Sequence, residues 1–271
     1  MPAIDLTRLQ KQIGELVSAF SEPAAFLKTL HEILGFYERR AYRPNRELMP
    51  KTFMRSYNLP AQVLTLIEIG LKQPASLYQE ETLRLAQALW QDPYYEARVL
   101  AAGILGHLPA ELSGETLALI EEWISAPLDR AALQTLLEKG SLPARLAGTW
   151  FPFVEKLLSS PSTRAQSVGL LALAKDLEQR PLTKYTGIFN LIRPFLQAGE
   201  ESLELNLSLV VKTLAQRTPN ETAYFLKQVL ADSSDSGIER RIRGYLEFFP
   251  PDAAAGLLKS VKNHASIYKT K

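Results

Sequence analysis

The sequence predicts an all-α fold, an α-solenoid of stacked helical hairpins. Apolar residues recur at three- and four-residue spacing in nearly every segment, and no stretch shows the sustained alternation of a strand. A phrase made of a turn and then a helix with small residues on one face also recurs, at 92–97 (DPYYEA) and at 160–165 (SPSTRA). Because a single amphipathic hairpin cannot bury its apolar stripe alone, we expect neighbouring hairpins to stack and to form an extended binding surface.

Local start signals mark the first two helices. Asp5 precedes an apolar stripe that ends at Phe20, and aspartate is a common residue at a helix N-cap. A second helix is predicted over 23–37, because Pro23 suits the first turn. The connection at about 40–58 is long for a helical protein, so it is either a functional loop or partly helical.

From residue 59 onward the helical spacing is regular, and proline marks most junctions. Proline disfavours helical backbone at the residue before it, so we place helix ends before Pro74, Pro93 and Pro161. The predicted helices are 60–72, 78–91, 94–107, 114–125, 128–140, 144–158, 162–178, 184–198, 201–217, 220–231, 237–248 and 251–262. We predict one continuous domain over 1–271, with N-terminal helices and a basic loop at 1–58, repeats at 59–262 and a flexible basic tail at 263–271.

The composition excludes several classes of function. The 271 residues include no cysteine, which excludes disulfides, zinc fingers, iron–sulfur clusters and a cysteine nucleophile. His31, His107 and His264 are dispersed, and no HExxH, GxSxG or GxxxxGK motif occurs, so we expect no metal site and no cofactor. The N-terminal segment lacks the pattern of a secretion signal, and no apolar run is long enough to span a bilayer. We therefore expect a cytoplasmic location and no membrane partner.

The net charge is only +2, so electrostatic binding depends on where the charges lie along the chain. Basic residues gather at 39–55, at 240–243 and in the tail after Asp252. The basic loop either contacts phosphates or is a solvated surface loop, and the residues alone leave both interpretations open. We interpret the tail as a solvated helix end. Arg240 and Arg243 lie on one face of a predicted helix, which makes them candidate phosphate contacts.

Two segments resemble a known family. Residues 88–98 (ALWQDPYYEAR) and 53–60 (FMRSYNLP) are similar to the DNA alkylation repair glycosylases built from HEAT-like repeats, in which a leucine–tryptophan pair precedes a turn and a helix. The similarity in order and spacing extends over about 53–249 and includes 121–124 (EEWI) and 215–220 (AQRTPN). The resemblance implies a right-handed superhelix whose basic concave face holds duplex DNA. It also implies an activity that removes positively charged alkylated bases without flipping them.

The resemblance further implies catalytic residues that this chain lacks. The family has a catalytic aspartate four residues after a tryptophan. An ungapped register puts Arg130 at the tryptophan and Gln134 at the aspartate, and a register shifted by two residues puts Leu128 and Ala132 there. A neutral glutamine cannot stabilise the oxocarbenium charge that develops during glycosidic cleavage. Asp129 is the one acidic candidate nearby, and we favour a role at the N-terminus of a helix for it.

Other family positions are substituted too. The second tryptophan of the cleft corresponds to Val210 or a near neighbour, and its neighbouring arginine corresponds to Lys212 or Thr213. A further arginine corresponds to a position near Ser167, one turn from Arg164. The resemblance thus implies the fold and DNA binding, whereas the missing residues imply that catalysis is lost.

The aromatic residues have a structural and a functional interpretation. Trp90, Trp123 and Trp150 each lie among apolar residues at helical spacing, so we favour core positions over stacking on bases. Tyr94 and Tyr95 start a helix and are the better candidates for exposure.

These observations favour a DNA-binding protein of HEAT-like repeats without glycosylase activity, with duplex DNA as its partner. One alternative is a protein–protein scaffold, a common role for such arrays, which the near-neutral charge permits. Another is an active glycosylase that uses a relocated carboxylate of Asp129, Glu121 or Glu122. The candidate nucleic-acid contacts are Arg39, Arg40, Arg43, Arg46, Lys51, Arg55, Arg130, Arg164, Lys212, Arg240 and Arg243.

Overall fold

The computed structural model describes residues 5–38, 54–126, 129–179, 185–233 and 236–268. The chain forms two compact units, Met1–Phe151 and Pro152–Lys271. The prediction of one continuous domain over the whole chain stays a prediction.

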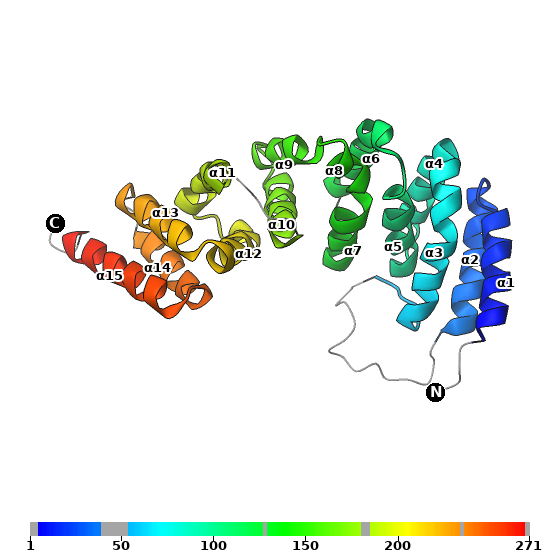
Figure 1. Cartoon of the computed structure of the whole chain (residues 1–271), viewed down its shortest axis with the longest axis horizontal. Helices are drawn as coiled ribbons and strands as arrows, with labels where there is room; N and C mark the ends of the chain where they lie inside the picture. Colours follow the sequence, from blue (N-terminus) through cyan, green and yellow to red (C-terminus); the bar gives the residue numbers. More distant parts are fainter. Residues whose placement is uncertain (1–4, 39–53, 127–128, 180–184, 234–235, 269–271) are drawn as a thin grey trace. The chain divides into compact units, whose positions relative to one another are not determined.

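In the first unit, helices pack side by side in two rows (Figure 1). The first row holds α1 (Leu6–Ser18), α3 (Ala61–Leu77), α5 (Tyr95–Leu105) and α7 (Arg130–Thr135). The second row holds α2 (Pro23–Tyr37), α4 (Gln79–Gln91), α6 (Ser113–Ser125) and α8 (Leu142–Leu146). A 3₁₀ turn, Ala110–Leu112, precedes α6, and a π-turn, Leu136–Gly140, follows α7. The apolar faces of the two rows meet and form the core.

The second unit repeats this arrangement. Its first row holds α10 (Thr163–Gln179), α12 (Glu201–Arg217) and α14 (Ser236–Tyr245), and its second row holds α11 (Tyr185–Ala198), α13 (Pro219–Ala231) and α15 (Pro251–Tyr268). A 3₁₀ turn, Leu246–Phe248, joins α14 to α15. The remaining helix, α9 (Trp150–Leu158), begins at the end of the first unit and continues into the second.

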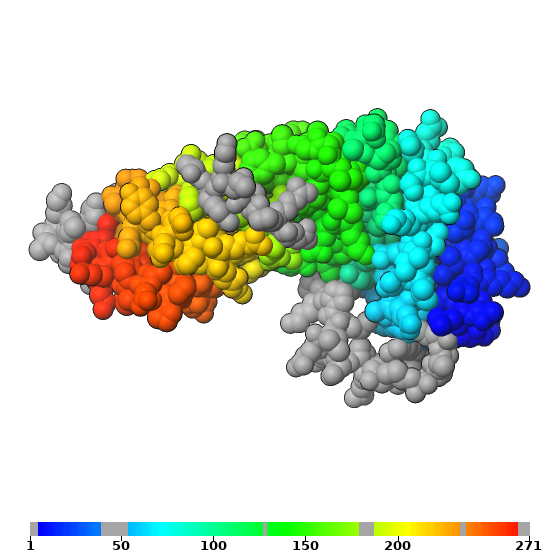
Figure 2. All heavy atoms as spheres, viewed as in Figure 1, coloured from blue at the N-terminus to red at the C-terminus, as the bar shows by residue number. Residues whose placement is uncertain are grey.

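The predicted all-α fold is confirmed. Among the described residues the β-structure amounts to one isolated bridge, between Arg55 and Tyr94. In the space-filling view, the atoms of successive helices within each unit form a continuous surface (Figure 2). Paired helices in two rows agree with a solenoid-like helical repeat, and the assignment to the HEAT type stays a prediction. No helix in the described ranges is long and apolar enough to cross a bilayer.

Most helices begin and end close to the predicted residues, because the signals that set their ends are local. The Asp5 side chain accepts a hydrogen bond from the Arg8 backbone N–H at 3.0 Å and so caps α1. Pro23 occupies the first turn of α2, where its missing N–H costs nothing.

Three predicted boundaries are wrong. Helix α15 continues to Tyr268, past its predicted end at residue 262, so the segment predicted as a flexible tail begins inside a helix. Helix α3 continues past Gln73 to Leu77, with Pro74 buried in its last turn. Proline removes one helical hydrogen bond there, and burial of its ring offsets that loss. The helix predicted over 144–158 is divided into α8 and α9. Gly148 adopts a left-handed backbone (φ 74°), and the Thr149 N–H donates to the Ala144 carbonyl at 2.9 Å, which is the Schellman ending of a helix.

The close approach of α5 to the π-turn gives a prediction about Gly106. A Cβ atom at this position would clash with the backbone carbonyl oxygen of Lys139, which cannot rotate away. Gly106→Ala is therefore expected to lower the free energy of unfolding by about 1–3 kcal/mol, as overpacking does elsewhere, in urea denaturation followed by circular dichroism.

The matched control is Gly114→Ala on α6, where a Cβ would meet no atom within 4 Å. Alanine is the better helix former, so this control is expected to be neutral or slightly stabilising. A Gly106→Ala protein as stable as the Gly114→Ala protein would contradict the packing of α5 against the π-turn.

Candidate nucleic-acid interface

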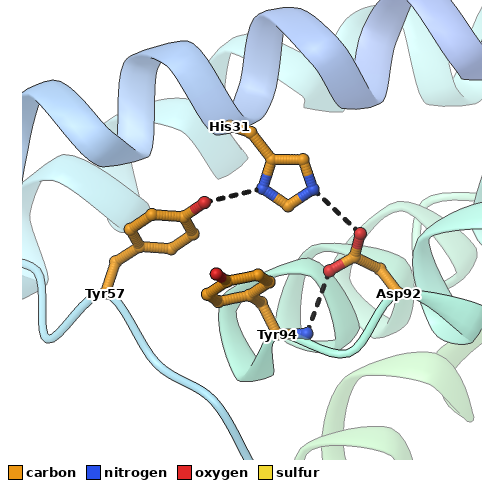
Figure 3. Close-up of polar contacts among 4 residues, drawn as sticks. All are labelled: His31, Tyr57, Asp92 and Tyr94. Atoms are coloured by element: carbon orange, nitrogen blue, oxygen red, sulfur yellow. Dashed lines mark hydrogen bonds and ion pairs between the residues drawn. The ribbon is translucent and has the colours of Figure 1, made fainter.

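Four residues from three segments of the first unit form a hydrogen-bonded group, the His31 cluster: His31, Tyr57, Asp92 and Tyr94 (Figure 3). The His31 Nε2 atom lies 2.9 Å from Asp92 Oδ2, and its Nδ1 atom lies 2.9 Å from the Tyr57 hydroxyl. The Tyr57 and Tyr94 rings stack with centroids 4.4 Å apart. An ionised aspartate only accepts hydrogen bonds, so in the neutral imidazole Nε2–H donates to Asp92 and Nδ1 accepts from the Tyr57 hydroxyl. The cluster thereby joins α2 to the segments that precede α3 and α5.

The recurring phrase of the sequence supplies the turn that builds this cluster. Asp92 Oδ1 accepts a hydrogen bond from the Tyr94 N–H at 2.9 Å across Pro93, which leaves Oδ2 for His31. In the second copy, the Ser160 hydroxyl accepts from the Ser162 N–H at 3.2 Å across a proline. In both copies the helix begins three residues after the side chain that closes the turn, so the repeated sequence corresponds to a repeated turn.

Burial and charge perturb the tyrosine of the cluster. Burial, followed by the neighbouring Tyr94 and the negative charges of Asp92 and Glu38, raises the pKa of Tyr57 to about 12. At neutral pH the Tyr57 hydroxyl therefore keeps its proton and acts as a hydrogen-bond donor to His31. This state suits a structural link and opposes a role as a nucleophile.

The raised pKa predicts a pH effect on stability. Because the pKa of Tyr57 is higher in the folded state than the ordinary value of about 10, its contribution is complete below pH about 10 and is lost as the pH rises through about 12. Over this interval the wild-type protein is expected to lose more free energy of unfolding than Tyr57→Phe, measured by denaturant unfolding at successive pH values. Equal losses in the two proteins would contradict the assignment.

A second contact set lies beside the cluster, at the first turn of α5. Glu96 is buried, and its Oε1 atom accepts hydrogen bonds from the Ser56 hydroxyl at 2.7 Å and the Tyr57 N–H at 3.0 Å. The Tyr95 N–H donates to the Arg55 carbonyl at 2.8 Å. These bonds hold the chain at 55–57 against α5.

The predicted DNA contacts divide into three groups. Arg39, Arg40, Arg43, Arg46 and Lys51 lie outside the described residues. In the first unit, Arg55 precedes α3 and Arg130 begins α7, and both are exposed. In the second unit, every first-row helix carries an exposed cation from the predicted set, namely Arg164 on α10, Lys212 on α12, and Arg240 and Arg243 on α14.

The arginine between the two α14 candidates has a different role. Arg241 is half-buried, and its guanidinium donates to the Leu196 carbonyl at 2.7 Å, one of the last carbonyls of α11. It also packs against Gly199, which has a left-handed backbone. Arg241 therefore fastens α14 to the end of α11, while Arg240 and Arg243 remain on the exposed face, as their helical spacing predicts.

The two weak catalytic candidates lie on or beside α7. The Asp129 carboxylate accepts hydrogen bonds from the Ala131 N–H at 2.9 Å and the Ala132 N–H at 3.3 Å, which confirms the predicted capping role. Gln134 is half-buried near the end of the same helix. Whether either position takes part in catalysis stays a prediction.

The aromatic predictions can be compared with burial. Trp90, Trp123 and Trp150 are buried, which confirms their core positions. Tyr94 and Tyr95 are both half-buried, and burial raises the pKa of Tyr95. No group of side chains able to hold a metal ion occurs in the part of the chain that the structure describes.

Sequence reasoning missed the roles of His31, Tyr57, Asp92 and Glu96. Two of these residues belong to the recurring phrase, so its polar positions were the available signal. The partners lie far away in sequence, since 61 positions separate His31 from Asp92 and 40 separate Ser56 from Glu96.

Comparison with known proteins identifies the family of the chain. No curated protein matches the chain. The model of the DNA alkylation repair enzyme family matches residues 44–241, which is well over half of the chain and runs from before α3 into α14. The matched part includes the Glu96 contacts and five of the six described cations predicted to bind DNA, and Arg243 lies outside it. The chain therefore belongs to the DNA alkylation repair enzyme family.

Proposed function

We propose that this protein binds duplex DNA through first-row arginines and lysines and does not excise bases. Membership of a DNA-repair family supports duplex DNA as the partner. The observation that carries the proposal is the exposure of Arg164, Lys212, Arg240 and Arg243 on consecutive first-row helices of one unit. Contacts between such cations and phosphates give affinity that does not depend on base sequence.

The absence of excision is proposed from the chemistry of α7. Loss of a cationic base leaves oxocarbenium character on the sugar, and a nearby carboxylate stabilises that charge. The ungapped register has Gln134 at the position of the family's aspartate, and an amide carries no negative charge. The Asp129 carboxylate is engaged by two backbone N–H groups at the helix start, where a capping aspartate stabilises the fold.

A paired assay tests both parts of the proposal. The full chain is incubated with an unmodified duplex and with the same duplex after methylation, and binding and the release of free 3- or 7-methylpurine are measured. We expect both duplexes to bind at low salt, with no release above that in the absence of protein. Release would establish an active glycosylase, and Asp129→Asn would then test the relocated carboxylate. Failure to bind either duplex would favour the protein scaffold.

A further inference from the structure

Several contacts fix the segment that carries Arg55. The Arg55 carbonyl accepts a hydrogen bond from the Tyr95 N–H, and the next two residues, Ser56 and Tyr57, both donate to Glu96 Oε1. The Tyr57 ring stacks on Tyr94, and its hydroxyl bonds to His31. The backbone at 55–57 is thus fixed to α5 and α2 before any ligand binds.

A closed turn fixes the other end of this segment. Asn58 has a left-handed backbone (φ 52°), which asparagine tolerates better than most residues. Its N–H donates to the Ser56 hydroxyl at 3.1 Å, and its side-chain amide donates to the Ser56 carbonyl at 3.3 Å. Ser56 therefore links the turn to Glu96.

The residue that binds this segment, Glu96, is a buried carboxylate. Its side chain is 3% exposed, and while Oε1 accepts two hydrogen bonds, Oε2 is buried with no hydrogen-bond partner among the described residues. A buried carboxylate is costly unless its oxygens are satisfied. Both hydrogen bonds that this carboxylate accepts come from the residues directly after Arg55. They fix the backbone of that segment.

The Arg55 side chain contrasts with its fixed backbone. It is exposed, and it makes no ion pair with any described residue. A guanidinium presents planar donors that match a phosphate group, and a fixed attachment point reduces the ordering that binding requires. An exposed cation is therefore attached to a fixed stretch of backbone.

We infer that Glu96 is a positioning residue that presents the Arg55 guanidinium to a phosphate of duplex DNA. This inference rests on the proposed function and adds a contact that the first unit supplies. Ser56 transmits the effect, since its hydroxyl bonds to both Glu96 and the Asn58 turn. His31 and Asp92 support the same segment through Tyr57.

A double-mutant cycle on the full chain tests the inference. Arg55→Ala and Glu96→Ala are each expected to weaken duplex binding by about 3- to 10-fold and to reduce the salt slope by about 1, as the loss of one phosphate contact does. The double variant is expected to be no weaker than either single variant, because Glu96 acts through Arg55. Glu96→Gln keeps an acceptor for Ser56 and Tyr57 and is expected to restore most of the affinity.

The control is Glu115→Ala, which removes an exposed glutamate from the first turn of α6 and should leave binding unchanged. Amide hydrogen exchange without DNA provides a second readout. In Glu96→Ala, and in Ser56→Ala should the first variant unfold, the amides at 56–58 are expected to exchange faster while those in the middle of α3 and α5 do not.

The outcomes separate the inference from the proposed function. The positioning role would be overturned if wild-type protein binds duplex DNA and the effects of Arg55→Ala and Glu96→Ala are additive. Unchanged amide exchange at 56–58 in Glu96→Ala would also overturn it. Both results would leave DNA binding intact. Wild-type protein that binds no duplex would overturn both.

Discussion

Simultaneous replacement of Arg164, Lys212, Arg240 and Arg243 by alanine is expected to lower the affinity of the full chain for duplex DNA by about 100-fold or more at about 0.1 M salt. Each phosphate contact adds roughly 0.9 to the slope of log K against log salt, so the slope should become shallower by about 3 to 4. All four side chains are exposed. Lys212, Arg240 and Arg243 make no ion pair within the described residues, so these three are available to an anionic partner. Their removal should leave the free energy of unfolding nearly unchanged, as is usual for surface substitutions.

A charge-matched comparison separates specific contacts from general attraction. Lys212→Ala/Arg240→Ala removes two cations from the first row, whereas Lys259→Ala/Lys262→Ala removes two exposed cations from α15 in the second row. Filter-binding or fluorescence-anisotropy titrations at several salt concentrations give affinity and slope for both. We expect a large loss in the first pair and a loss of only a few-fold in the second. Equal losses would show that net charge matters and the first row does not.

Trp90→Ala is expected to destabilise the first unit by about 3–5 kcal/mol, the usual cost of removing a large aromatic side chain from a core. Trp90 is 5% exposed, and its ring stacks on that of Trp123 with centroids 4.5 Å apart and 8° between planes. The Arg98 guanidinium lies 5.3 Å from the Trp90 ring centroid, so the substitution also removes a cation–π contact. The cavity would lie between α4 and α6, where second-row helices meet.

Chemical denaturation followed by circular dichroism measures this cost. Trp90→Phe keeps an apolar ring and should lose less, and Tyr224→Ala removes a tyrosine that is 64% exposed and should lose almost nothing. A Trp90→Ala protein of normal stability that binds DNA poorly would contradict the core assignment and favour stacking of this ring on bases.

The features that could be predicted from sequence are those set by neighbours along the chain. The starts of α1 and α2 follow from Asp5 and Pro23, and the cap of α7 follows from Asp129, because each acts within a few residues of itself. Exposure of Arg240 and Arg243 follows from helical spacing against Ile238 and Ile242, which are buried.

The features that could not be predicted depend on conformation or on distant partners. The division of α8 from α9 requires a left-handed Gly148, whereas the apolar spacing continues through it. The residue type of Pro74 predicts a helix end before it, but Pro74 is buried in the last turn of α3, which continues to Leu77. The bonds of His31 to Asp92 and of Glu96 to Ser56 join residues that only the stacking of helix pairs brings together.

The salt dependence of binding to an unmodified duplex tests the central claim most directly. With Arg55, Arg130 and the four first-row cations of the second unit in contact with phosphates, log K for the wild-type chain should fall linearly with log salt, with a slope of about −5. Absence of binding at low salt, or binding whose strength does not change with salt, would contradict the account.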